Sequence, residues 1–576
     1  MDTIIIMPNG KLERKECKQM KKNRLVRLLS ILCAAAMLFG MLSACGSSAS
    51  DSAVAENSAE AASVEETAGA EETAGAEEAA PAEEAVASVD DAAAPAESIF
   101  PLEETATFTM FYVWSPHFVE LGFDSPNDFQ FFSELEKKTN VHIDFTTIGA
   151  NVFEETFLLM MATQDYTDIF FNCAGSYNGG IAKAIDDDAW IDLAPYMEEY
   201  APNYTALMES DPDFEKANLT DDGGIGEFMQ YYVNSFNNGG NLIRQDWLDN
   251  LGLDVPETYD DWYDVLSAFT NEYGLTESIL STVPTSGFWP AVDDGYIVRD
   301  GKVVNAFAEE DLCMDYLTIA KKWYDAGLFS LDAYAGYTPD DSMTKILNGE
   351  VGIYNVDVDQ VDTYAEQMAD PNYKYTAIGK PVLNAGDVPK DATQSVYGHG
   401  FTISSACENV ELAVQWMDNW YTEDIELLAN YGVEGVSFEY DADGNPHFTS
   451  VVLDDPEGLN FALFKYVVDW GPTVLDWGRK LDSYTQFQQD ALVIWCNNDD
   501  SMGYPTFASY TTDESTELAQ YQTDIQTVID ENIPKMVSGA MSLDEYDSFV
   551  QQLYDCGLQE VLDIRQASYD RYQARG

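Results

Sequence analysis

Beyond its first hundred residues, the order of apolar and polar positions in the chain predicts alternating strands and helices. Residues 108–113, 141–145 and 168–172 are short apolar runs typical of buried strands, and residues 127–139 and 152–163 between them carry helical patterns. A strand–helix–strand–helix–strand order predicts a parallel sheet with right-handed crossovers. We therefore expect an α/β fold for the folded body.

Later helices are predicted from apolar stripes with a period near 3.6 residues. One begins at Thr258, where Asp261 completes a variant capping box, and another ends before Gly327, a residue type common just after a helix. Residues 515–574 are also helix-rich. We interpret the stripes as core packing rather than ligand contacts. They consist of Trp262, Val265, Leu266 and Phe269; of Leu312, Tyr316, Ile319 and Trp323; and of Leu412, Trp416 and Trp420.

The first 44 residues have the pattern of a targeting signal. Four basic residues between positions 21 and 27 precede an apolar run over 28–44, which is slightly short for a membrane-spanning helix. The run ends in Leu-Ser-Ala-Cys, which resembles the lipobox of bacterial lipoproteins. The resemblance implies cleavage before Cys45, a lipid on its thiol, and attachment to the extracytoplasmic face of the cell membrane. A plain secretory peptide and an uncleaved anchor are the alternatives, and a start at Met20 fits a signal better than one at Met1.

Residues 45–100 are predicted to be the lipidated cysteine and a disordered acidic tether. Positions 46–100 contain 14 acidic residues, no Lys or Arg, and no aromatic residue before Phe100, and the hexapeptide at 65–70 repeats at 71–76. Such a segment cannot bury apolar surface, and its charges repel one another. We interpret it as a spacer for a folded body over 101–576, although a spacer without a selected length is equally open.

The net charge narrows the possible partners. The whole chain has a formal charge of −74, and from Cys45 onward 20 basic side chains face 99 acidic ones. Nucleic-acid binding needs Lys and Arg to neutralise phosphates, so we expect no nucleic-acid partner. Flat adsorption on anionic lipid is disfavoured for the same reason.

The search for catalytic and metal-binding motifs is mostly negative. The four histidines form no HExxH motif, and GxSxG, P-loop and complete GxGxxG motifs do not occur. The five cysteines after Cys45 contain no CxxC pair, which favours small buried hydrophobes. Residues 441–445 resemble the start of a calcium loop, but the twelfth position is Val452, so an Asp-Gly hairpin is the better interpretation. We therefore expect no enzyme activity, cofactor or metal, although a pair of glycosidase carboxylates stays open.

Several stretches carry a resemblance to a known family: ELEKKTNVHI at 134–143 with DYTDI at 165–169, RQDWLDNLGL at 244–253 with PET at 256–258, KWYDAGL at 322–328, NYGVEG at 430–435 with DADG at 441–444, and ASYDRY at 567–572. In this order they resemble the extracellular solute-binding lipoproteins of ABC importers, in the carbohydrate-type (family 1-like) branch, over residues 105–574. The resemblance implies a two-lobed, periplasmic-binding-protein-like α/β fold with hinge strands and an interlobe cleft. It also implies capture of a sugar or oligosaccharide and delivery to ABC permease subunits.

The same resemblance implies where the lobes divide. The first lobe would comprise about 104–230 and 396–430 and the second about 231–395, with the remaining C-terminal segments shared. The chain would cross near 229–232 and return near 397–401. Glycines beside the return crossing can absorb backbone rotation at low cost.

Candidate ligand-binding residues follow from the chemistry of sugars. Sugar rings have apolar faces and hydroxyl rims, which suit aromatic platforms and polar partners in loops after strand ends. For each Trp the alternative is an interior ring, for His399 a structural hinge residue, and for Asp357 a solvated acid or a cap. A peptide or other polar solute, a surface glycan hydrolase and an adhesin without a small ligand are the alternative functions. The candidates are Trp114, Asn172, Tyr177, Trp289, Asp357, Tyr397, His399 and Trp470.

Overall fold

The computed structural model describes residues 2–6, 12–16, 98–234, 238–289, 295–391, 397–468 and 470–576. Apart from an antiparallel hairpin of β1 (Asp2–Ile6) and β2 (Leu12–Glu16), the predicted signal segment and residues 45–97 of the tether lie outside these ranges. None of the helices in the described ranges combines the length and the apolar character needed to cross a bilayer.

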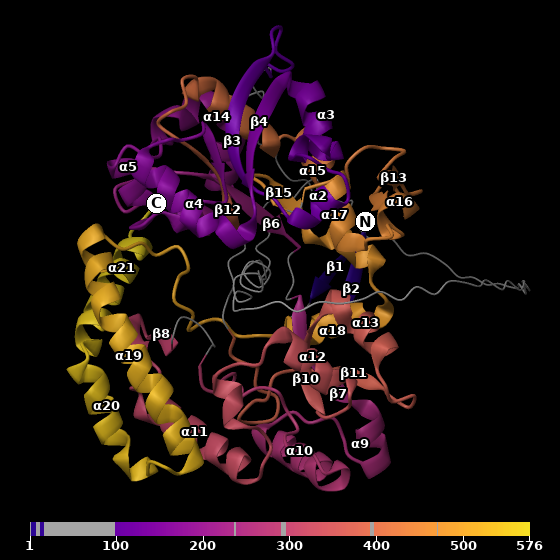
Figure 1. Ribbon diagram of the computed structural model, residues 1–576, viewed down its shortest axis with the longest axis vertical. Coiled ribbons are helices and arrows are strands. Elements are labelled where there is room, and N and C mark those ends of the chain that lie inside the picture. The colour runs from indigo at the N-terminus through magenta and orange to yellow at the C-terminus, as the bar shows by residue number, and fades with distance from the viewer. Residues whose placement is uncertain are drawn as a thin grey trace, which may run out of the picture.

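Two separate sheets define two lobes, one above the other in Figure 1. The upper sheet has the order β15 (Val474–Asp476), β6 (Phe228–Val233), β12 (Tyr397–Ile403), β5 (Ile169–Phe171), β3 (Ala106–Val113) and β4 (Val141–Ile148). Strand β3 pairs in parallel with β4 and with β5, which confirms the predicted arrangement of the first three strands. Strand β12 runs antiparallel to β5 and β6, so the complete sheet is mixed.

Helices cover this sheet because their apolar faces follow the helical period. In α3 (Gln130–Thr139) the buried side chains include Phe131, Phe132 and Leu135, as predicted, and the helix ends at Asn140 in the left-handed conformation. The other helical elements of the upper lobe are α2 (Pro116–Glu120), η2 (Pro126–Asp128), η3 (Ala150–Val152), α4 (Phe153–Thr163), η4 (Ala174–Ser176), α5 (Gly180–Asp186), η5 (Ala194–Tyr196), α6 (Met197–Tyr200), α7 (Pro202–Ser210), α8 (Pro212–Asn218), α14 (Val410–Asp418), η9 (Asn419–Tyr421), α15 (Glu423–Tyr431), α16 (Ser450–Leu453) and α17 (Leu459–Tyr466). The predicted Asp-Gly hairpin is confirmed between β13 (Phe438–Tyr440) and β14 (Pro446–Phe448).

The lower lobe is built on an antiparallel sheet with the order β10 (Ile353–Asp357), β7 (Gly239–Arg244) and β11 (Tyr375–Ile378). Helix α10 (Tyr259–Tyr273) begins with both hydrogen bonds of the predicted capping box, and its predicted apolar stripe is buried. The remaining elements are β8 (Tyr296–Arg299), β9 (Lys302–Asn305), α9 (Gln245–Leu251), α11 (Glu310–Asp325), η7 (Leu331–Tyr334), α12 (Pro339–Leu347), η8 (Val358–Gln360), α13 (Val361–Gln367), η10 (Trp477–Ser483) and α18 (Gln486–Trp495).

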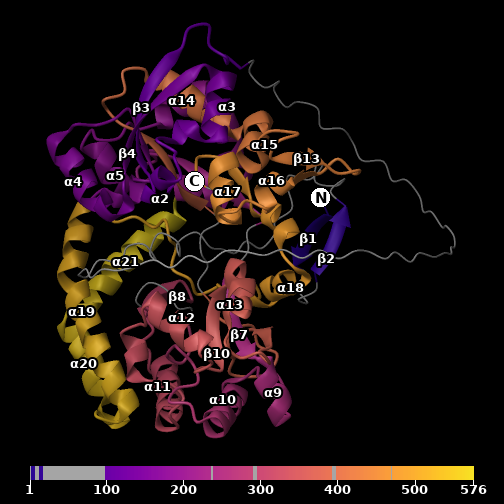
Figure 2. The ribbon, with the colours of Figure 1, turned by 45° about the vertical axis from the view of Figure 1, so that its right-hand side comes forward.

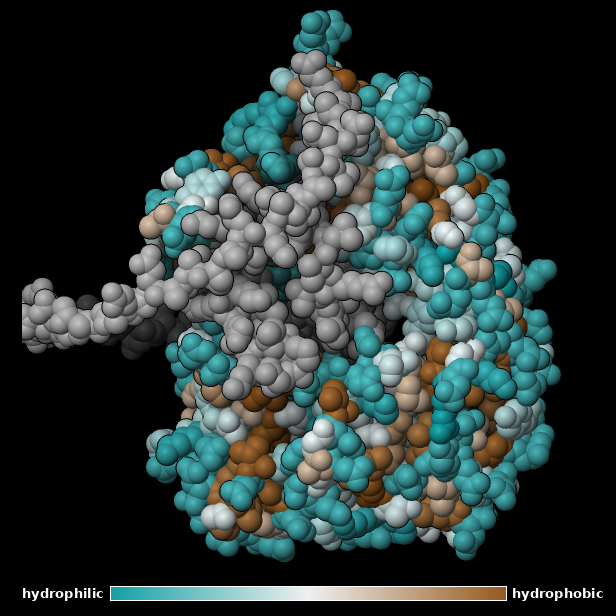
Figure 3. Space-filling model, turned by 180° about the vertical axis from the view of Figure 1, so that it is seen from behind, coloured by the Kyte–Doolittle hydropathy of each residue, from teal (hydrophilic) through white to brown (hydrophobic). Residues whose placement is uncertain are grey.

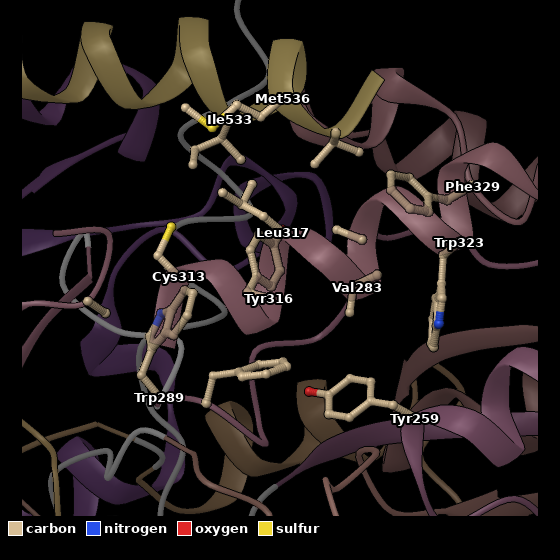
Figure 4. Packing of buried hydrophobic residues seen from close by; sticks show 14 of the residues in the cluster. Tyr259, Val283, Trp289, Cys313, Tyr316, Leu317, Trp323, Phe329, Ile533 and Met536 are labelled. Atoms are coloured by element: carbon tan, nitrogen blue, oxygen red, sulfur yellow. The ribbon is translucent and has the colours of Figure 1, made fainter. Parts of the chain in front are cut away.

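The chain ends in the helices α19 (Thr512–Ser538), α20 (Tyr546–Asp555) and α21 (Leu558–Gln573), with η11 (Leu543–Glu545) before α20, which confirms the predicted helix-rich end. Figure 2 shows them along one side of the lower lobe. Helix α19 buries Ile533 and Met536 in the same core as Tyr316 and Leu317 of α11 (Figure 4). The C-terminal helices therefore extend the core of the lower lobe.

The lobes have separate cores joined by a smaller one. One large cluster of buried apolar residues lies in the lower lobe and another under the upper sheet. A third cluster contains Tyr232 of β6 and Leu475 of β15 together with Leu242 of β7 and Trp495 of α18. Elements of both lobes therefore pack together where the chain passes between the two sheets.

The surface agrees with the composition. Figure 3 shows mainly hydrophilic residues on the upper half of the rear face and more hydrophobic residues between them on the lower half. An acidic, hydrophilic exterior is expected of a body that has 85 acidic side chains over residues 101–576, the 99 from Cys45 onward less the 14 of the tether.

Candidate functional site

The connections between the sheets identify the edges that face one another. Strand β6 ends at Val233 and β7 begins at Gly239, so the carboxyl end of β6 and the start of β7 lie at the interlobe boundary. Because β10 and β11 run antiparallel to β7, their carboxyl ends lie at the same edge of the lower sheet. Residues that follow β3, β5, β6 and β15 lie at the facing edge of the upper sheet, which is where open α/β sheets bind ligands.

Three predicted site residues lie at the upper edge, and they differ in how far they are exposed. Trp114 follows β3 and is 5% exposed, with its ring packed against Phe118 and Phe129. Asn172 follows β5, is half-buried, and has the left-handed φ of 52° that asparagine tolerates. Tyr177 is also half-buried. Of the three, Asn172 and Tyr177 leave polar atoms near the boundary.

Tyr177 is held by a small polar network. Its hydroxyl donates to Asp187 Oδ2 at 2.9 Å, and Lys183 forms an ion pair with the same carboxylate. Burial, followed by the hydrogen bond to Asp187, raises the pKa of Tyr177 above its ordinary value. The phenol is therefore neutral at physiological pH, and its hydroxyl is held by the Asp187 carboxylate.

The return strand β12 brings Tyr397 and His399 to the same edge. The ring of Tyr397 stacks on Tyr231 of β6, with centroids 5.8 Å apart, and its hydroxyl donates to Asp211 at 3.4 Å. Tyr397 therefore contacts the strand on which the chain leaves the upper lobe. His399 lies in β12, and its side chain is outside the described part of the structure.

Asp357 lies across the boundary, at the carboxyl end of β10 opposite Gly239. Burial and the neighbouring Asp359 raise the pKa of Asp357. Gly239 leaves space for this carboxylate, because a Cβ at that position would lie 3.0 Å from Asp357 Oδ1. Asp357 is thus a half-buried acceptor directed at the point where the chain enters the lower lobe.

A notch beside Asp357 contains residues that were not predicted from the sequence. It is a small cavity of about 20 Å³, room for one water or one hydroxyl group rather than a whole sugar ring. The indole of Trp495 forms one wall and donates from Nε1 to the carbonyl of Asn241 at 3.3 Å. The other lining side chains that carry polar groups are Lys380, Asp391, Asn497 and Asn498.

Two tryptophans flank β15, and the one that lies at the interlobe edge is Trp477 rather than the predicted Trp470. Trp470 precedes the strand, and its half-buried ring packs against the core of the upper lobe. Trp477 follows the strand and therefore lies at the interlobe edge, where its ring makes an edge contact with Tyr232 at 5.9 Å. The register of β15 against β6, rather than any local motif, decides which of the two reaches the boundary.

Trp289 does not reach either edge. It is 2% exposed and packs against Phe307 and Tyr316 inside the lower lobe, as Figure 4 shows for its contact with the α11 side chains. The structure therefore places this ring in the core, which is the alternative open to every tryptophan in the chain.

The edges offer hydrogen bonds and aromatic faces rather than a reactive group. Within the described ranges, no group of three or more His, Cys, Asp or Glu side chains is arranged to hold a metal ion. The polar residues at the edges are amides, carboxylates and phenols, and the exposed aromatic surface comes from rings anchored in cores. Such a constellation binds and orients a polar solute between two rigid bodies.

Two lobes that face each other across short connections define a hinged binding protein. The comparison with family models agrees: residues 129–426 match the family described as bacterial extracellular solute-binding protein, and the chain belongs to that family.

The relatives are similar over most of the chain. A fructooligosaccharide ABC transporter substrate-binding protein, FusA of Streptococcus pneumoniae, is 24% identical over 525 residues, which is 82% of this chain and 92% of FusA. The polygalacturonan/rhamnogalacturonan-binding protein YtcQ of Bacillus subtilis is 24% identical over 53% of this chain and 62% of its own length. Among solved structures, one similar protein is described as an HMO-binding, ABC-transporter-associated solute-binding protein from Bifidobacterium longum infantis. It has a TM-score of 0.67 at 18% identity, over 81% of this chain and 99% of that one. This last likeness supports the two-lobed fold.

Proposed function

We propose that this protein captures an oligosaccharide between its two lobes and delivers it, unaltered, to an ABC importer. The observation that carries the proposal is the meeting of two sheet edges from separate lobes. Tyr177 and Trp477 lie at one edge, and Asp357 and the Trp495 notch lie at the other. Aromatic faces with amide and carboxylate acceptors suit the apolar faces and hydroxyl rims of sugars. The similarity to FusA over most of both chains favours a sugar over a peptide.

The mechanism we infer is hinge closure. A solute that contacts both edges binds the closed arrangement more tightly than the open one and therefore shifts the population toward closure. The lobe boundaries that we propose are those expected from the sequence, with residues 104–230 and 396–430 in one lobe and 231–395 in the other. The third link, from Asp476 through η10 to α18, adds Trp477 and Trp495 to the two edges.

We also propose that a lipid on Cys45 and the acidic tether keep the binding body near the permease subunits. The support is the sequence: a basic flank, a short apolar run and a lipobox are followed by a segment without aromatic anchors. A single lipid chain holds a protein only weakly, so the two acyl chains of a diacylglycerol fit a stable anchor.

Binding is tested by thermal-shift and calorimetric titration with neutral and acidic oligosaccharides and with peptides. Asn497 is exposed and lines the notch, and within the described ranges its side chain forms no hydrogen bond. Asn497→Ala should therefore weaken sugar binding by about 3- to 10-fold through one lost hydrogen bond, without changing the melting temperature. Asn250→Ala, on exposed α9, is the matched control. Binding of peptides alone, or recovery of a cleaved sugar by mass spectrometry, would show that the proposal is wrong.

The anchor is tested separately. Cys45→Ala should remain unprocessed or appear in the culture medium, whereas the unchanged protein should fractionate with membranes. Intact mass of the mature protein reports the lipid directly. An unmodified N-terminus upstream of Cys45 would contradict the proposed anchor and leave the binding proposal untouched.

A further inference from the structure

The basic side chains near the interlobe edges are already paired with acids. Lys183, after Tyr177 at the upper edge, forms an ion pair with Asp187. At the lower edge, Lys380 in the notch pairs with Asp391. Lys390, ten residues further along the same connection, pairs with Asp499 at 3.0 Å. Each positive charge is therefore matched by a carboxylate within contact distance.

Two further cations lie in the link between β15 and α18, and both are enclosed. Arg479 and Lys480 are each 2% exposed. The guanidinium of Arg479 donates to the carbonyls of Ala429 and Asn430 at 3.3 Å. The ammonium of Lys480 lies 4.9 Å from the ring centroid of Trp477. Neither group is presented to a solute between the lobes.

The sequence also shows whether basic residues occur in the segments outside the described ranges. Residues 235–237, 290–294, 392–396 and 469, which lie outside the described ranges, include no Lys or Arg. His399 of β12 is of a residue type that becomes cationic only at low pH. Among the described residues named above, each Lys or Arg near the edges is therefore either paired with an acid or enclosed.

Carboxylates are also present at both edges. At the lower edge, Asp357 ends β10 and Asp359 lies two residues further on, and within the described ranges no hydrogen-bond donor is found for Asp359 Oδ2. At the upper edge, Asp476 ends β15, accepts from the side chain of Asn234 at 2.8 Å, and lies near the positive charge of Arg479. Such groups accept hydrogen bonds from hydroxyls and repel a ligand that carries carboxylates of its own.

We propose that the solute is an uncharged oligosaccharide and that chains of uronic acid are excluded. Moving an anion between the lobes removes its hydration, and an unpaired cation is the group that offsets this cost most strongly. The cations that could supply it are engaged with Asp187, Asp391 and Asp499 or are enclosed. A neutral sugar needs no such compensation, and its hydroxyls donate to Asp357 and Asp359. This inference rests on the proposed function and decides between the neutral and acidic glycans that the names of its relatives include.

The test is calorimetric titration at pH 8 with matched trisaccharides: kestose, maltotriose and xylotriose against trigalacturonate. We expect at least one neutral trisaccharide to bind, and trigalacturonate to bind at least about 100-fold more weakly. Equal or tighter binding of trigalacturonate would overturn the inference while leaving the proposed function in place. If peptides bind and no sugar does, or if nothing binds, the proposed function is wrong and the inference falls with it.

Variants that remove the acidic partners of the two lysines test whether this pairing causes the discrimination against an acidic sugar. Asp391→Asn removes the acidic partner of Lys380, and Asp499→Asn removes that of Lys390. In either variant, the ratio of the dissociation constant of trigalacturonate to that of the neutral trisaccharide should fall by about tenfold. Two variants guard against a fold defect in one of them. Asp325→Asn, which frees Lys321 on α11 of the lower lobe, is the control and should leave the preference unchanged. An unchanged preference in both test variants would contradict the proposed cause.

Discussion

Among single residues, Asp418 shows how burial and capping act against each other. It ends α14 and accepts hydrogen bonds from the side chain of Asn203 at 2.6 Å and from the backbone N–H of Tyr204 at 2.8 Å. These donors lie in the first turn of α7, so the carboxylate caps a neighbouring helix. Burial is the larger effect, and it raises the pKa of Asp418 to about 6.

The raised pKa has a definite consequence for stability. Because the folded state binds this proton more tightly than the unfolded state, in which the pKa is about 3.9, the contribution of Asp418 is complete below about pH 4 and is lost as the pH rises through 6. Relative to Asp418→Asn, the unchanged protein should lose on the order of 2–3 kcal/mol of unfolding free energy between pH 4 and pH 7. Urea unfolding across this range measures the difference. Asp424→Asn, at an exposed acid of the same lobe, is the control, and parallel profiles for Asp418→Asn and the unchanged protein would contradict the assignment.

Gly240 is a second residue with a testable role. A Cβ at this position would lie 2.2 Å from the indole of Trp495, so only glycine allows the ring to lie flat on β7. Gly240→Ala should cost about 1–3 kcal/mol of unfolding free energy and displace the ring from the notch, which tryptophan fluorescence and sugar titration both report. Gly379 lines the same notch, but a Cβ there would approach no atom closer than 3.9 Å. Gly379→Ala should therefore leave the free energy of unfolding and the sugar affinity nearly unchanged. Equal effects of the two variants would show that the ring does not depend on Gly240.

What the sequence predicts at the residue scale depends on whether the cause is local. The capping pair Thr258 and Asp261 was predictable, because both partners lie within one turn. The difference between Trp470 and Trp477 was not, because it depends on the register of β15 against a strand more than 200 residues earlier. Trp495 could not be predicted as a site residue for the same reason, because its ring packs on Gly240 of β7, which is distant in the sequence.

Among the elements, β12 is constrained by close approach rather than by rotation. The sequence suggested that Gly398 and Gly400 absorb backbone rotation at a hinge, yet neither has a positive φ. A Cβ on Gly400 would instead lie 1.8 Å from the carbonyl oxygen of Phe228, at an irregularity in the pairing of β12 with β6. The glycine is needed because two backbones approach each other there.

Gly400→Ala should therefore separate β12 from β6 and destabilise the upper lobe by about 3 kcal/mol or more. The clashing atom is the backbone carbonyl oxygen of Phe228, which cannot move away as a side chain can. Gly398→Ala is a stringent control on the same strand. Its Cβ would meet the hydroxyl of Tyr232 at 2.8 Å, the far end of a side chain that can move, so the cost should be smaller. Urea unfolding of both variants gives the comparison. A cost for Gly398→Ala at least as large would favour the rotational explanation.

The elements themselves were largely predictable, and their assembly was only partly so. Strands β3, β4 and β5 and the helices between them follow the apolar periodicity, and their parallel pairing follows from the order of elements. The antiparallel insertion of β12 between β5 and β6 was not expected from any local pattern. It requires a strand that returns from another lobe, and periodicity carries no information about such long-range pairing.

At the scale of the whole molecule, the end of the chain ties the two lobes together. Helix α21 packs in the core of the lower lobe, but Arg571 and Arg575 at its end reach Asp221 of the upper lobe. Arg575 also donates to the carbonyls of Lys216 and Phe507, and Arg571 pairs with Glu514. These partners lie up to 359 positions apart in the sequence, so neither composition nor local spacing could have predicted that they meet.

This clamp should influence how the lobes move. Asp221 is partly buried, which alone would raise its pKa, but hydrogen bonds from Arg575 and Arg571 outweigh burial and lower it. The ionised Asp221 carboxylate therefore stabilises the folded state at any pH above the ordinary pKa of an aspartate, which is about 4. That stabilisation is lost as the pH falls below this value. The clamp joins the residues at the end of α21, a helix of the lower lobe, to Asp221 of the upper lobe, so it bridges the two lobes.

Asp221→Asn should leave the enclosed guanidinium of Arg575 without a carboxylate and the partly exposed Arg571 with Glu514 alone, with an expected cost of about 2–3 kcal/mol of unfolding free energy. Because the clamp joins the lobes and no core residue is altered, the distribution of interlobe distances in the sugar-free protein should also broaden. Spin labels on ketone-bearing residues introduced at Glu154 of α4 and Thr363 of α13, both exposed, report that distribution without using the native cysteines. Asp311→Asn removes a bidentate arginine partner within the lower lobe alone, so it should cost less than about 1 kcal/mol and leave the distances unchanged. A loss of stability with an unaltered distance distribution would mean that the clamp supports the fold without governing the hinge.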